Sequence, residues 1–342
     1  MDNLQFFWVD FRHIFLPAAR LLVRGTDPYI VLNFFNPPWA LFPILPLTSL
    51  PDLMAVLLWT LVNLAITIYA LHLTAEHYGI GRGWIRLGVT SVLLLSPFSL
   101  GNLYTGQLSA FVLLGLVGSF VWHSSGIAPM LLAVKPNLGI LAGMVWFIDK
   151  IRNYDWKPIL RTLMWFSLIS LILTMMAPGI WAGLLDNLLS ARYMATVPKQ
   201  ITSIPHVLRR FGISPWLWSP WIIMGIWAIF RWPGLETTAS ASLIITPFAR
   251  PHDNILLFPV ILYYVQRRSW VAMSLSALLL CSPLLRLFFP IGYWVDGMSA
   301  MAMFLILIVE KLVRRERIRE ARIEKEAEII GVVVGSRSEH RK

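Results

Sequence analysis

Long apolar runs dominate this chain and restrict what it can fold into. Of its 342 residues, 57% are hydrophobic and only 14% are charged, against roughly 25% charged residues in an ordinary soluble domain. A helix needs about 20 consecutive apolar residues to cross a bilayer. Since lipid offers the backbone no hydrogen bonds, only helices and closed barrels can span it. The sequence therefore predicts an all-α, polytopic transmembrane helix bundle.

Nine apolar runs are candidate membrane spans. They are residues 52–76, 87–100, 106–122, 159–177, 215–231, 234–249, 254–266, 269–287 and 293–310. Several are short for a full crossing, which is tolerated where a helix faces protein or a cavity. A membrane domain over residues 1–310 should then be followed by a tail, 311–342, whose mixed charges at helical spacing predict a solvated cytoplasmic helix with a disordered end.

Basic residues predict which side of the membrane each loop faces, because cytoplasmic loops carry an excess of Lys and Arg. They gather around residues 82–86, 150–161 and 267–268 and in the tail. If all these regions lie on the cytoplasmic side, an even number of spans must separate residues 82–86 from residues 150–161. The runs 87–100 and 106–122 already supply two spans. Residues 127–148 should therefore enter and leave the membrane on the same side, as a broken hairpin with Lys135 near its apex. Residues 10–51, 101–105, 178–214 and 250–253 then face the other side. The net charge of +11 thus indicates anionic membrane lipids as partners and not nucleic acid.

A polar, basic segment, residues 9–29, precedes the first long apolar run. Asp10 could be the N-cap of a helix over residues 11–24, and Asp27 should start a tight turn. Residues 1–9 are too short to cross a bilayer and do not resemble a signal peptide. We therefore expect either that a first span is missing or that the true start lies upstream. Residues 35–51 are too rich in proline for a regular helix and predict an interfacial or re-entrant segment.

Several short motifs occur in an order that is typical of one family. They are Asp10-Phe11, Pro17-Ala18-Ala19-Arg20, Gly25-Thr26-Asp27-Pro28-Tyr29, Asn36-Pro37-Pro38, Gly106-Gln107, Val134-Lys135-Pro136, and Thr246-Pro247 followed by His252-Asp253. In this order and spacing the chain resembles glycosyltransferase family 87, a group of polyprenyl-phosphate-mannose-dependent membrane enzymes with the GT-C fold. The chain departs from the family pattern at Ser109, Phe248 and Arg250, since the family usually has Asn at the first position and His at the other two.

The resemblance implies a GT-C-like bundle with a long first extracytoplasmic loop. It implies that Asp10 is the catalytic base, that the donor is a sugar on a polyprenyl phosphate, and that the acceptor is a lipid-linked or exported glycan. Such a transfer needs a carboxylate to accept the proton of the acceptor hydroxyl. It also needs cations near the leaving phosphate.

The remaining site candidates are substrate-binding residues, and each has a structural alternative. Lys135, Arg250 and His252 could bind the phosphate, but Lys135 could also snorkel to the membrane surface, and the other two could simply pair with Asp253. Gln107 could hydrogen-bond sugar or backbone. Arg12 and Asp253 complete the set of candidates.

Three hypotheses for the function follow. The first is an inverting hexosyltransferase at the extracytoplasmic face of the cell membrane that uses Asp10 as its base. The second is a transporter or flippase of a lipid-linked or polar substrate, because broken helices also suit transporters. The third is a non-catalytic assembly subunit. No metal-binding or nucleotide-binding motif is present, so we expect no metal and no cofactor besides the lipid-linked donor.

Overall fold

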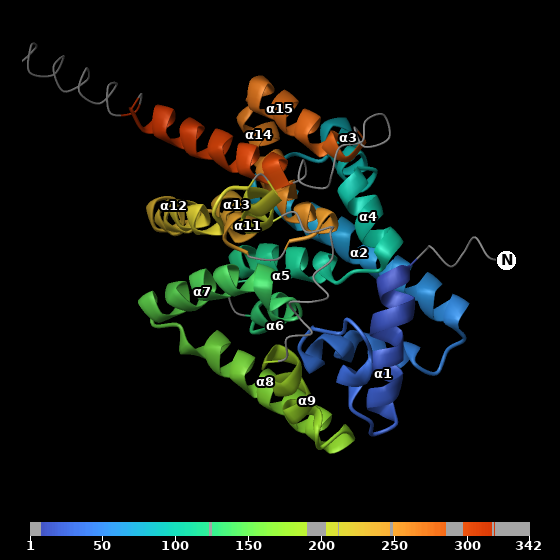
Figure 1. The fold of residues 1–342 in the computed structure, drawn as a ribbon. Helices are drawn as coiled ribbons and strands as arrows, with labels where there is room; N and C mark the ends of the chain where they lie inside the picture. The colour runs from blue at the N-terminus through green and yellow to red at the C-terminus, as the bar shows by residue number, and fades with distance from the viewer. Residues whose placement is uncertain are drawn as a thin grey trace, which may run out of the picture.

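The computed structural model is helical throughout the residues that it describes, which confirms the all-α prediction (Figure 1). These residues are 8–122, 125–189, 203–210, 212–246, 249–284, 297–316 and 318. The elements are η2 (Phe11–Phe15), α1 (Leu16–Val23), η3 (Pro28–Ile30), η4 (Pro38–Leu47), α2 (Asp52–His77), α3 (Trp84–Leu94), α4 (Pro97–Thr105), α5 (Ser109–Val121), α6 (Ile127–Ala133), α7 (Pro136–Arg152), α8 (Trp156–Met176), α9 (Ile180–Leu189), α11 (Ile204–Arg210), η5 (Pro215–Trp218), α12 (Ser219–Arg231), α13 (Leu235–Ile245), η6 (Pro251–Leu257), α14 (Phe258–Arg267), α15 (Trp270–Leu280) and η7 (Ser282–Leu284). A further helix covers residues 297–316 and is red in Figure 1.

Among the residues that the structure describes, fewer helices are long and apolar enough to cross a membrane than the nine apolar runs predict. Within the described residues, α2 and α8 are long and apolar enough, and the pair formed by α3 and α4 makes a third span if its 51° bend lies within the membrane. Much of the outer surface of α2 and α8 is apolar and exposed, including Leu57, Leu61, Leu160 and Leu171. These two helices therefore present the surface that lipid would cover.

Helix α5 is a core helix and not a lipid-facing span. It has 13 residues, and every residue from Ser109 to Gly118 is buried. A helix of this length is about 20 Å long, which is too short for a bilayer core of roughly 30 Å. It packs against α2, α6, α7 and η6 and lies in the middle of the molecule in Figure 1. Protein surrounds this helix, so its apolar sequence reflects burial inside the fold.

Proline residues set the breaks between the central helices. Pro97 is the first residue of α4, and the Ser96 hydroxyl caps that helix by accepting the Ser99 backbone N–H at 3.3 Å. The predicted single span 87–100 is therefore two helices, and residues 101–105 are the end of α4 where a loop was expected. Pro136 similarly starts α7 directly after Lys135. The break within 127–148 is where the sequence predicts it, while its arrangement in the membrane stays a prediction.

The last described helix is fixed to the bundle by a buried ion pair. Lys311 Nζ lies 2.6 Å from Glu236 Oε1 of α13, and the two side chains are only 12% and 6% exposed. The Tyr78 hydroxyl at the end of α2 donates to the other Glu236 oxygen at 2.8 Å. Lys311 is thus half-buried, although the sequence predicts a solvated tail from this residue onward. Residues 319–342 lie outside the described part of the chain.

Candidate active site

Asp10 precedes a short π-helix, and its carboxylate points to segments distant in sequence. Asp10 has helical dihedral angles and makes no capping hydrogen bond, so the structure does not support the N-cap alternative. Its Oδ2 atom instead accepts hydrogen bonds from Gln107 Nε2 and, at 3.1 Å, from Arg250 Nη1. A π-helical turn often marks a functional site. The side chain of Asp10 is 13% exposed, so it can still be reached from outside.

Gly106 brings Gln107 next to Asp10. Gly106 ends α4 in the left-handed conformation, with φ +71°, which is unfavourable for residues with a Cβ. An added Cβ would lie 2.5 Å from Phe11 Cβ, so the close approach of the two backbones also requires glycine. The indole of Trp59 donates to the Gly106 carbonyl at 2.8 Å and stacks on the Phe11 ring at 5.2 Å. These contacts fix the Gly106-Gln107 turn against the helix that follows Asp10.

Lys135 lies at the break between α6 and α7, where it forms a buried ion pair. Its ammonium is 2.5 Å from Asp253 Oδ1, and the side chains are 12% and 1% exposed. It also donates to Ser109 Oγ at 3.2 Å and to Gln107 Oε1 at 3.4 Å. An ammonium has three N–H donors, and all three have protein acceptors here. The snorkelling alternative is therefore wrong, because this lysine points into the protein.

Asp253 organises the start of η6. Its Oδ2 atom accepts a hydrogen bond from the backbone N–H of Arg250 at 2.8 Å. Its Oδ1 atom accepts hydrogen bonds from the Ser109 hydroxyl, at 2.6 Å, and from the Lys135 ammonium. Burial alone would raise the pKa of Asp253, but the Lys135 charge and these hydrogen bonds lower it to about 2. The group is therefore ionised at neutral pH and holds the Arg250 backbone in place.

His252 is buried beside this ion pair in its neutral form. Burial lowers the pKa of His252 to about 3, aided by the positive charges of Lys135 and Arg250 and opposed by Asp253. Its Nε2 atom is 3.7 Å from Asp253 Oδ1 and has no hydrogen-bond partner in the described part of the structure. A neutral imidazole cannot serve as a fixed cation for a phosphate group.

Six of the seven residues that the sequence singled out meet in one cluster, which we call the Asp10 cluster. It consists of Asp10, Gln107, Ser109, Lys135, Arg250, His252 and Asp253. Ser109 was not among the candidates, although its departure from the family pattern was a signal. Arg12 is half-buried on η2, two residues from Asp10, and its binding role stays a prediction. Within the described residues no three His, Cys, Asp or Glu side chains are grouped to hold a metal ion.

Two other predicted features have clear outcomes. Asp27 starts a turn as expected, since its Oδ1 atom accepts the Tyr29 N–H at 2.9 Å. Residues Pro38–Leu47 form a 3-10 helix and not a regular α-helix.

Comparison with known proteins gives one match. No curated protein and no solved structure matches the chain significantly. A family model does match, over residues 34–283. This segment contains all members of the Asp10 cluster except Asp10 itself, and it covers well over half of the chain. On this match the chain belongs to glycosyltransferase family 87.

Proposed function

We propose that this protein transfers a hexose, mannose in the first instance, from a polyprenyl phosphate to a hydroxyl of a lipid-linked or exported glycan. Membership of glycosyltransferase family 87 implies transferase activity and favours this reaction over the transporter and scaffold hypotheses. The observation that carries the proposal is the meeting of Asp10 with Arg250 and Gln107, from segments up to 240 residues apart. A partly exposed carboxylate beside a guanidinium provides the base and the cation that the reaction needs.

Asp10 is suited to the role of the base. Its Oδ2 atom is held by Arg250 and Gln107, while no hydrogen bond to its Oδ1 atom is found among the described residues. That oxygen can accept the proton of the acceptor hydroxyl as the hydroxyl oxygen bonds to C1 of the sugar. The C1–O bond to the phosphate breaks at the same time, and the polyprenyl phosphate leaves with the electron pair. Asp10 therefore needs no covalent intermediate.

The same geometry supports inversion of the anomeric centre in the proposed reaction. A retaining mechanism would need a second carboxylate that attacks C1 as a nucleophile. The other carboxylate of the Asp10 cluster is Asp253, which is 1% exposed and holds Lys135 and Ser109 on one oxygen and the Arg250 backbone on the other. A carboxylate enclosed in this way cannot reach a sugar.

Arg250 is the better candidate for the donor phosphate, and Lys135 is better described as a positioning residue. The Arg250 side chain is 29% exposed and uses one of its nitrogens for Asp10, so other N–H groups can face a ligand. Arginine commonly binds phosphate in a bidentate manner. The three donors of Lys135 are already used within the protein. Lys135 thus orients Gln107 and Asp253, which in turn hold Asp10 and Arg250.

The proposed site is at the membrane, where a lipid-linked donor is found. The apolar outer surfaces of α2 and α8 provide a path for a polyprenyl chain. We place the Asp10 cluster at the extracytoplasmic face, since the loops rich in Arg and Lys belong on the cytoplasmic side together with the C-terminus.

The test is Asp10→Asn in the purified full-length protein. The assay measures polyprenyl phosphate released from a panel of polyprenyl-phosphate hexoses in the presence of membrane glycolipid extract, so the acceptor need not be known beforehand. Loss of a general base should reduce the rate by about 10²–10⁴-fold. Thermal unfolding of the variant should match that of the parent protein, because asparagine keeps the shape of the side chain.

Asp52→Asn is the matched control. Asp52 is also an aspartate paired with an arginine, Arg20, but its side chain is 56% exposed and lies at the start of α2. This variant should keep full activity. Retained transfer by Asp10→Asn, or equal losses in both variants, would remove Asp10 from the reaction. Release from a nucleotide sugar, with none from any polyprenyl phosphate, would overturn the proposed donor.

A further inference from the structure

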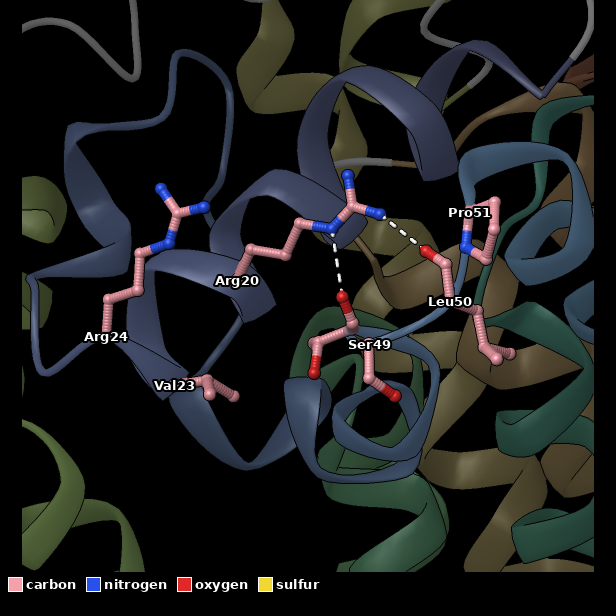
Figure 2. A pocket seen from close by; sticks show the side chains of 7 residues that line it. Arg20, Val23, Arg24, Ser49, Leu50 and Pro51 are labelled. Atoms are coloured by element: carbon pink, nitrogen blue, oxygen red, sulfur yellow. Dashed lines mark hydrogen bonds between the residues drawn. The ribbon is translucent and has the colours of Figure 1, made fainter.

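A second polar site lies away from the Asp10 cluster. A pocket of about 510 Å³ opens between the end of α1 and the turn that joins η4 to α2 (Figure 2). Arg20 lines it from α1, Arg24 from the position directly after this helix, and Ser49 from the turn. The backbone N–H of Arg24 still bonds to the Arg20 carbonyl, so the two arginines lie one helical turn apart. The volume is within the range of small-molecule sites, about 300–1,000 Å³.

The two arginines differ in how far their charges are compensated. Arg20 is fully engaged, since it donates to the backbone carbonyls of Thr48 and Leu50 at 3.2 and 2.9 Å and to Asp52 Oδ1 at 2.7 Å. Arg24 is exposed, and within the described part of the chain no hydrogen bond or ion pair joins its guanidinium to another group. Arg20 therefore stiffens the wall of the pocket, and Arg24 leaves an uncompensated positive charge in it.

The pocket lies beside the start of a candidate membrane span. Pro51, one of its lining residues, directly precedes α2, the longest helix able to cross a membrane. The first turns of α2 below it carry apolar side chains that face outward, with Leu53 60%, Met54 57% and Leu57 49% exposed. A molecule in the pocket thus meets cations and a hydroxyl on one side and a lipid-facing apolar surface on the other.

We propose that this pocket binds the phosphoryl headgroup of a membrane lipid. In this arrangement Arg24 donates to the phosphate oxygens, the Ser49 hydroxyl assists it, and the hydrocarbon chains of the lipid lie along Leu53 and Met54. The proposal does not rest on the proposed function, because it concerns binding outside the Asp10 cluster and is tested without measuring transfer.

The chemistry favours a phosphomonoester headgroup, as in phosphatidic acid. Arginine binds phosphate through paired N–H donors, and a monoester exposes more free oxygens to such a pair than a diester does. A choline headgroup would bring a fixed positive charge close to Arg24. The carboxylate of Asp52, the residue after Pro51, is already paired with Arg20.

The experiment measures lipid binding to the detergent-purified full-length protein by native mass spectrometry. Phosphatidic acid and phosphatidylcholine with identical chains are titrated separately, with inorganic phosphate added as a competitor. Arg24→Gln should weaken the binding of phosphatidic acid by about tenfold or more, since a hydrogen bond to a charged group is lost. Phosphatidylcholine should bind more weakly and respond little to the substitution.

Two further variants keep the test decisive. Arg82→Gln is the matched control, because Arg82 is 87% exposed and lies beyond the other end of α2; it should bind phosphatidic acid like the parent protein. Ser49→Trp should block the pocket without changing a charge. Equal binding in the Arg24 and Arg82 variants, or no preference for phosphatidic acid, would overturn the proposal. Complete displacement by inorganic phosphate at the lipid's own concentration would overturn the assignment to a lipid.

Discussion

The ion pair between Lys135 and Asp253 allows a quantitative test of the structure. Replacing Lys135 by Met removes the ammonium and leaves a carboxylate that is 1% exposed. Asp253 would keep the Ser109 hydroxyl and the Arg250 backbone N–H, but it would lose the charge that compensates its own. We therefore expect Lys135→Met to be strongly destabilising, and the Asp10 cluster to lose its organisation.

The magnitude follows from the burial of the pair. Breaking a buried ion pair by removing one partner costs about 3–5 kcal/mol. Because Lys135 is 12% exposed and two hydrogen bonds to Asp253 remain, we expect a value near the lower end of this range. Adding Asp253→Asn removes the uncompensated charge. The double variant should therefore be more stable than Lys135→Met alone, by about 1–2 kcal/mol.

The assay is denaturant or thermal unfolding of the detergent-purified protein. Lys150→Met is the matched control, because the Lys150 side chain is also buried, at 7% exposed, whereas its partners Asp149 and Asp155 are 56% and 39% exposed. No buried charge remains when Lys150 is removed, so we expect a loss of about 1 kcal/mol or less. Equal losses for the two lysines, or simple additivity in the double variant, would refute the reasoning.

Two further predictions concern the surroundings of the Asp10 cluster. Gly106→Ala should destabilise the protein by about 2–4 kcal/mol, because it combines a left-handed backbone with a clash against Phe11. Gly79→Ala is the control, because Gly79 also has a positive φ, +67°, but no atom lies within 4 Å of the added carbon. It should lower the free energy of unfolding by only about 1–2 kcal/mol. A Gly106 variant that is no less stable than this control would contradict the packing argument. The low pKa of His252, about 3 against 6.5 when unfolded, means that the unfolded state binds the proton first as the pH falls. Stability should thus decrease from pH 6.5 to pH 5, before Asp253 takes up a proton in the unfolded state, where its pKa is 3.8. His252→Gln should flatten this profile of unfolding temperature against pH, and an unchanged slope would show that His252 is not its cause.

The sequence predicted helix type and helix breaks well where local chemistry decides them. Pro136 ends the preceding helix because proline excludes the helical conformation from the residue before it. Asp27 starts a turn through its own side chain. Both outcomes depend on residues within a few positions of each other, which is why they can be read without knowledge of the fold.

Membrane crossings were harder to predict, because an apolar run has the same composition whether it faces lipid or protein. Helix α5 illustrates this, since Leu113 and Leu116 are covered by other helices, while Leu57 and Leu61 of α2 are exposed. Length separates the two cases better than hydropathy does. Thirteen residues cannot span a bilayer, and proteins accept short helices only where other protein surrounds them.

Contacts between distant segments could be predicted only in part. The motif order singled out Asp10 and Gln107, and the need for a cation near the phosphate singled out Arg250, but the pairing of their side chains depends on the packing of distant segments. Ser109 was missed because a serine at the start of an apolar helix has many structural roles. Lys311 was missed because its neighbours form a run of mixed charge that is typical of a solvated helix, whereas its partner Glu236 lies 75 residues earlier.

The charges of the Asp10 cluster balance, and this bears on the proposed function. The carboxylates of Asp10 and Asp253 match the cations of Lys135 and Arg250, and His252 is neutral. A donor phosphate entering the cluster therefore competes with Asp10 for Arg250. As the guanidinium turns to the phosphate, Asp10 Oδ2 loses its hydrogen bond from Arg250 Nη1 and becomes available to another donor. In the proposed reaction, binding of the donor thus frees the base for the acceptor hydroxyl, and an empty site keeps Asp10 paired with Arg250.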